Sequence, residues 1–110
     1  MTSNADKRWF AVRTVYTFGV KSDGKNLYEE RIVAFTAQDA DYAMEKAEAE
    51  SDEYAKGASI EQIHDDVWSY EQDGDDLIDG YELWSQVFES DLSLHDFYAE
   101  RYTKYHYNPD

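Results

Sequence analysis

Hydrophobic and polar side chains alternate from Trp9 to Val20 and again from Tyr28 to Thr36, which is the pattern of half-buried β-strands. The pair Asp23-Gly24 lies between the two stretches and readily supplies the two positive φ angles of a type I′ turn. The pattern therefore predicts a β-hairpin. Its register about this turn would place two apolar pairs opposite each other: Val12 with Phe35, and Val15 with Ile32.

The pattern changes to helical spacing in residues 36–57, where alanines and Met44 recur three and four residues apart. Thr36 is the expected N-cap, and Gly57 is the expected residue just past the C-terminal end. The opposite face carries the acidic side chains Asp41, Glu45, Glu48, Asp52 and Glu53. Such a face is more often solvated than used for docking, and both interpretations stay open.

Two further strands are expected, one beginning at Val67 and one over residues 81–88, with an acidic loop between them. The last of these strands is apolar on both faces, so the second face of the sheet needs a cover, which could be the terminal helix or another protein. That helix should begin at Ser93. An aromatic stripe follows the cap and is expected to be core, with an exposed recognition face as the alternative: Leu94, Phe97, Tyr98, Arg101, Tyr102 and Tyr105.

These elements define a single α+β domain over residues 9–106, with an antiparallel four-stranded sheet and two helices in the order ββαββα. Residues 1–8 should form a frayed N-terminus and residues 107–110 a C-terminal tail. Cysteine is absent, which excludes disulfides, thiolate metal sites and a cysteine nucleophile. Neither a membrane-spanning run nor the apolar region of a signal peptide is present, so we expect a cytoplasmic protein.

Acidic residues are strongly segregated along the chain. Residues 57–100 contain thirteen Asp or Glu and no Lys or Arg, and the whole chain has a formal net charge of −15. This field repels nucleic-acid phosphates and anionic membranes, and it attracts basic surfaces. Composition therefore disfavours direct binding to nucleic acid or membrane and favours a basic protein as the partner.

Signs of catalysis or of metal binding are weak. The loop 73–80 (DGDDLIDG) offers carboxylates to a hard cation, but no EF-hand spacing fits, because Trp84 or Gln86 falls where a bidentate Glu belongs. The pairs His64-Asp65 and His95-Asp96 suggest ligands of a metal-dependent hydrolase, which is the alternative function from another class. No nucleophile elbow and no phosphate-binding glycine loop occurs. We expect no enzyme activity, no metal and no cofactor.

Three stretches of the chain resemble a known family: WFAVRTVY, YEERIVAFTAQDADYAMEKA and DVWSYEQDGDDLIDGYELWSQVF. They are similar to small bacterial domains catalogued only as a domain of unknown function, which open with W-aromatic-x-[AV]-[KR] and end with DVYEL…DG-x-E-V-[YW]-S. The resemblance covers residues 9–88 and implies a small α+β domain with an antiparallel sheet, without any activity to carry over. This chain departs from the family pattern in its longer, more acidic loop and in its Tyr-rich tail.

We therefore expect a non-enzymatic protein-binding domain, of the kind in which an immunity or inhibitor protein covers the basic surface of a partner such as a nuclease toxin. Charge would steer the partner and buried aromatic rings would anchor it. Two other interpretations remain: a homodimer that seals the second sheet face, and a charge that serves solubility alone. The expected partner-binding residues are Asp65, Asp66, Trp68, Asp73, Asp75, Asp76, Asp79 and Trp84.

Overall fold

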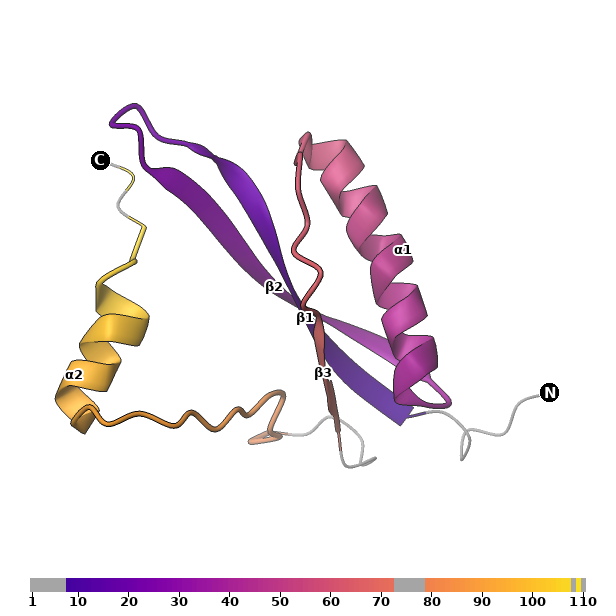
Figure 1. The fold of residues 1–110 in the computed structure, drawn as a ribbon. Helices are drawn as coiled ribbons and strands as arrows, with labels where there is room; N and C mark the ends of the chain where they lie inside the picture. The colour runs from indigo at the N-terminus through magenta and orange to yellow at the C-terminus, as the bar shows by residue number, and fades with distance from the viewer. Residues whose placement is uncertain (1–7, 73–78, 108, 110) are drawn as a thin grey trace.

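The structure is a computed structural model, and it describes residues 8–72, 79–107 and 109. Its sheet has three antiparallel strands in the order β2-β1-β3, with α1 on one face and the C-terminal segment on the other (Figure 1). The α+β class with two helices is confirmed. The elements are β1 (Arg8–Val20), β2 (Asn26–Ala37), α1 (Ala40–Ala58), β3 (Trp68–Glu71), α2 (Leu94–Tyr98) and a π-helical turn, η2 (Ala99–Thr103).

The hairpin is confirmed, but its predicted turn and register are wrong. Gly24 has φ 88° while Asp23 does not have a positive φ, and Gly24 N donates to Lys21 O over 2.9 Å, so three residues form the loop instead of two. The three-residue loop shifts the strand pairing by one residue, and a bulge between Thr17 and Gly19 shifts it by one more. Phe10 therefore faces Phe35, in place of the predicted Val12. The two single-residue offsets add to two along residues 8–17, so the side chains there keep their predicted faces. Val20 lies beyond the bulge and is offset by one residue only, so it changes to the face opposite α1.

The helix α1 is the element that builds the core. Its N-cap is Asp39 rather than Thr36: the Asp39 carboxylate accepts a hydrogen bond from Tyr42 N. It ends at Ala58, and the residue just past its end is Ser59, two residues later than the expected Gly57; the left-handed backbone of Ser59, with φ 57°, stops the helix. Small side chains let it lie close to the hairpin, and the core cluster consists of Phe10, Val12, Ala37, Ala43 and Ala47.

The predicted fourth strand is wrong, because residues 81–88 form no strand in the structure. This segment meets the sheet through side chains instead of a backbone ladder. The Trp84 ring lies 5.7 Å from that of Tyr70, whose hydroxyl bonds Glu82 over 2.9 Å. A segment that is apolar on both faces has no preferred face to bury, so its alternation did not determine strand pairing.

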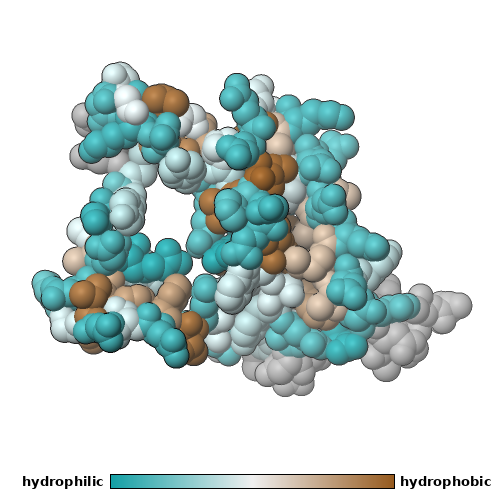
Figure 2. All heavy atoms as spheres, viewed as in Figure 1, coloured by the Kyte–Doolittle hydropathy of each residue, from teal (hydrophilic) through white to brown (hydrophobic). Residues whose placement is uncertain are grey.

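The terminal helix begins at Ser93 as predicted, since the Ser93 hydroxyl accepts a hydrogen bond from Asp96 N. The prediction that its aromatic stripe is core is wrong. Only Phe97 turns inward, 5.5 Å from the ring of Phe88, whereas Leu94 and Tyr98 are exposed. Residues 94–107 stand away from the sheet, and an opening passes between them and the rest of the molecule (Figure 2).

Candidate functional site

A groove with an acidic rim runs between α1 and the segment that leads into β3. Its volume is about 460 Å³, and Figure 2 shows apolar side chains at the surface along this boundary with hydrophilic atoms beside them. We call it the acidic groove. Its lining comes from three parts of the chain: Thr14 of β1; Asp41, Met44, Glu45, Ala47, Glu48, Ser51 and Asp52 of α1; and Ile63, His64, Asp65 and Val67.

One rim of the acidic groove comes from α1. Asp41, Glu45, Glu48 and Asp52 follow one another at intervals of four, three and four residues, which places them on one side of the helix. Like charges at this spacing destabilise a helix by about 0.2–0.5 kcal/mol per pair. The helix therefore carries a repulsion that a bound cationic group would relieve.

The opposite rim is built around His64 and Asp65. His64 Nδ1 accepts a hydrogen bond from Asp66 N over 3.0 Å, so this nitrogen carries no proton in that arrangement. Its 3.7 Å distance to an Asp65 carboxylate oxygen is then not an ion pair. Asp65 remains fully exposed, and its charge adds to that of the α1 rim.

The floor of the acidic groove is apolar apart from two hydroxyl groups. Thr14 is 4% exposed, and its hydroxyl makes no hydrogen bond with another described residue. Ser51 is also buried, but its hydroxyl lies 2.9 Å from that of Tyr16. An apolar floor with one unused hydroxyl suits a ligand that carries both an apolar and a polar group.

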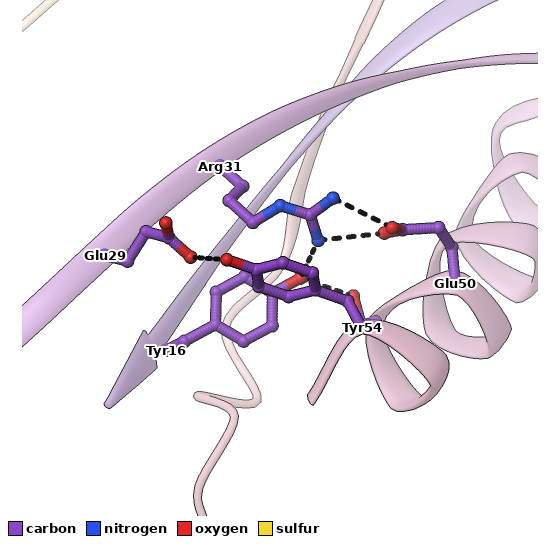
Figure 3. A network of polar contacts seen from close by, with 6 residues as sticks. Tyr16, Glu29, Arg31, Glu50 and Tyr54 are labelled. Carbon is purple, nitrogen blue, oxygen red and sulfur yellow. Dashed lines mark hydrogen bonds and ion pairs between the residues drawn. The ribbon is translucent and has the colours of Figure 1, made fainter. Parts of the chain in front are cut away.

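A polar cluster fastens α1 to the hairpin behind the acidic groove (Figure 3). Arg31 of β2 forms two hydrogen bonds with the Glu50 carboxylate, at 2.8 and 3.1 Å, and donates a third to the buried Tyr16 hydroxyl at 3.0 Å. Its guanidinium also lies 3.6 Å from the ring centre of Tyr54, whose hydroxyl donates to Glu29 over 2.5 Å. Bidentate geometry and ring stacking fix the helix in one position.

The same contacts shift two pKa values. The hydrogen bonds to Glu50 raise the pKa of Arg31, which stays charged at every accessible pH. The hydrogen bond to Glu29 raises the pKa of Tyr54, because the phenol must keep its proton to donate it. At neutral pH Tyr54 therefore keeps the proton that it donates to Glu29, and this bond is lost only when the phenol ionises in alkaline solution.

Several basic side chains elsewhere in the described chain are already engaged. Arg8 pairs with Glu71 at 2.8 Å, Lys104 pairs with Glu100 at 3.4 Å, and Arg13 lies 5.4 Å from the ring centre of Trp68. No Lys or Arg is among the described residues that line the acidic groove, and its α1 carboxylates form no ion pair with a described residue. The negative potential of this surface is thus uncompensated within the described chain.

The structure does not gather the described members of the predicted partner-binding set into one site. Asp65 lies on the rim of the acidic groove. Asp66 accepts a hydrogen bond from Trp68 Nε1 over 3.0 Å, and Trp68 pairs with Arg13, which puts its ring on the sheet face away from α1. Trp84 packs on Tyr70, which belongs to that same face.

The remaining predicted residues belong to the acidic loop. Asp79 is exposed beside Gly80, whose φ of 85° turns the chain. Asp73, Asp75 and Asp76 lie outside the described residues. The sequence alone leaves open whether the groove carboxylates of α1 are solvated or used for docking, and one signal favours docking: no Lys or Arg follows Asp41, Glu45 or Glu48 four residues later to balance the charge.

The His-Asp pairs do not assemble a metal site in the part of the chain that the structure describes. No group of three or more His, Asp or Glu side chains there is arranged to hold a metal ion. Among the same residues, no helix combines the length and apolar character that crossing a membrane requires.

The fold and the groove define a small α+β domain: an antiparallel sheet with one long helix clamped to it and an acid-rimmed groove along that helix. The chain belongs to the family described as Domain of unknown function (DUF4288), whose model matches residues 9–85. The match spans the hairpin, α1, β3 and Trp84, and it ends before α2. Comparisons with curated proteins and with solved structures gave no match.

Proposed function

We propose that this protein is a non-enzymatic binding protein whose acidic groove takes a basic segment of another protein. The observation that carries the proposal is the groove itself, where five carboxylates surround an apolar floor and no described Lys or Arg lines it. Cationic side chains of a partner would meet the rims, and an apolar side chain between them would reach the floor.

An immunity or inhibitor protein is the kind of binder that we favour. Such a protein blocks its partner by covering a basic surface, and a net charge of −15 accelerates the encounter with that surface. A clamped helix supports this role, because a rigid site loses little conformational entropy on binding. The partner would be a basic protein such as a nuclease toxin, and the bound form would be inactive.

The test is affinity capture from a lysate of the source organism with three baits of known net charge. The first is the wild-type chain. The second removes the five charges of the groove, and the third removes five charges of the acidic stretch that follows it. The groove variant carries D41N, E45Q, E48Q, D52N and D65N, and the loop variant carries D66N, D73N, D75N, D76N and D79N.

We expect one basic protein to bind the wild type and the loop variant in stoichiometric amount, to be released by salt, and to be missing from the groove variant. Purified partner should lose its activity on addition of one equivalent of wild-type chain. Capture by the groove variant but not by the loop variant would move the site to the acidic stretch. Equal capture of many basic proteins by all three baits would mean that the charge serves solubility alone.

A further inference from the structure

The surface away from the acidic groove has apolar side chains that nothing in the described chain covers. On the sheet, Val20, Tyr28 and Ile32 share the face opposite α1. On residues 94–107, which we call the C-terminal arm, the uncovered side chains are Leu94, Tyr98, Tyr102 and Tyr105. All seven are between 46% and 83% exposed.

The arm cannot be stable as an isolated helix. Residues 94–103 make ten residues of α-helix and π-helix, and helices shorter than about 12–15 residues are marginal in water without packing. Its contacts with the hairpin include Arg101 Nη2 at 3.8 Å from a Glu30 carboxylate oxygen, and Lys21 Nζ at 5.9 Å from the ring centre of Tyr107. Neither contact buries the apolar stripe, so the arm needs a further surface.

We propose that a second copy of this chain supplies that surface, and that the arms of two copies pack against each other and cover the exposed sheet faces. At about 100 Å² for each half-exposed large side chain, the seven residues offer about 700 Å² per copy. A stable interface removes about 800 Å² from each partner. The uncovered area thus has the size that a dimer requires.

Charge on the arm favours a second copy over the basic partner that the groove would bind. Asp96 and Glu100 are balanced by Arg101 and Lys104, so the arm is neutral in a chain of net charge −15. Two copies can therefore meet here while their acidic grooves stay apart. In an antiparallel pair about a two-fold axis, the acidic start of one arm faces the basic end of the other.

The arrangement of the molecule agrees with this interface. The arm and α1 lie on opposite sides of the sheet, and an opening passes between the arm and the rest of the molecule (Figures 1 and 2). The family model ends at residue 85, so the arm lies beyond the region that this chain shares with its family. Dimerisation would be a property of this added segment and would leave both acidic grooves free.

The test measures the mass of the full-length chain by sedimentation between about 5 and 200 μM in 0.15 M salt. We expect a dimer for the wild type and, for the double variant Tyr98→Ser and Tyr102→Ser, a dissociation constant raised at least about tenfold, because buried tyrosines carry much of the affinity of an interface. The matched control is Tyr42→Ser, which removes an exposed ring from α1 and should leave the dimer intact.

A crosslink provides a second readout that does not depend on affinity. The chain has no cysteine, so a single introduced thiol can form a disulfide only between two copies. We expect Tyr98→Cys to crosslink on mild oxidation and Ala49→Cys, on the exposed side of α1, to stay monomeric. A wild type that is monomeric at every concentration, or a dimer that survives the double substitution, would overturn the proposal and would leave the groove experiment unaffected.

Discussion

Both faces of the sheet have large aromatic side chains beside them, but these side chains are buried on the α1 face and exposed on the other. On the α1 face, Phe10, Val12 and Tyr16 are each about 1% exposed. On the other face, Tyr28 and the tyrosines of the C-terminal arm remain more than half exposed. Aromatic content alone therefore does not make a core. A core forms where a long element lies along the strands and excludes water over its whole length.

The physical difference lies in the covering elements. The helix α1 has 19 residues and presents Ala43, Ala47 and Ala55 to the sheet, so its backbone can approach closely. The arm presents bulky tyrosines with hydroxyls that prefer water, and it follows a segment without regular structure. These differences extend the molecule: its radius of gyration is 16.9 Å, against about 13 Å for a compact domain of this length.

The largest expected effect compares one phenylalanine from each face. Phe10→Ala removes a fully buried ring from the core and should lower the free energy of unfolding by about 3–5 kcal/mol. Phe97→Ala removes a half-buried ring of the arm and should cost less than about 1 kcal/mol. Urea denaturation at one protein concentration measures both, and Phe10→Leu replaces the first variant if it does not fold. Equal costs would mean that both faces contribute equally to the core.

The next effect compares two arginines. Arg31→Met breaks the clamp behind the acidic groove and leaves Glu50 and the buried Tyr16 hydroxyl without their donor, for a cost of about 1–2 kcal/mol after allowance for partial exposure. Arg101→Met breaks a long, exposed pair with Glu30 and should cost less than about 0.5 kcal/mol. The two variants are compared by urea denaturation. A larger loss of unfolding free energy in Arg101→Met than in Arg31→Met would mean that the arm side, and not the α1 side, contributes more to stability.

A smaller effect should depend on pH. The bond from Tyr54 to Glu29 raises the pKa of this phenol, so the stability that it provides is complete below the ordinary tyrosine value of about 10 and is lost as the pH rises through the folded-state value. Tyr54→Phe should therefore lower the melting temperature at pH 8 and make less difference at pH 11. The control Tyr42→Phe alters an exposed ring on the same helix and should lower the melting temperature at pH 8 less than Tyr54→Phe does.

The smallest expected changes in the free energy of unfolding have opposite signs on α1 and on the C-terminal arm. Glu48→Gln relieves repulsion with Glu45 and Asp52 and should raise the free energy of unfolding by about 0.2–0.5 kcal/mol. Glu100→Gln removes a favourable pair with Lys104 and should lower it by a similar amount. Both effects should fade in 1 M salt. A loss of stability in Glu48→Gln would show that this carboxylate has a stabilising contact within the chain.

Local patterns predicted the hairpin, the long helix and the cap at Ser93, because alternation, helical spacing and capping depend on neighbours in the sequence. They failed at residues 81–88. Both faces of this segment are apolar, so the alternation of side chains does not indicate which face is buried. They also failed at the register, since the three-residue loop and the bulge at Phe18 depend on how Tyr28 to Ala37 returns along the first strand.

The sequence by itself determined that this protein is acidic, free of cysteine, folded as α+β and a member of its family, because composition and short-range periodicity contain that information. Only the tertiary structure shows which acidic side chains lie together on one surface. Thr14, the α1 carboxylates and Asp65 meet in one groove although they are far apart in the chain. Only the tertiary structure decided the exposure of the arm, because the burial of a stripe depends on what lies beside it and not on its spacing.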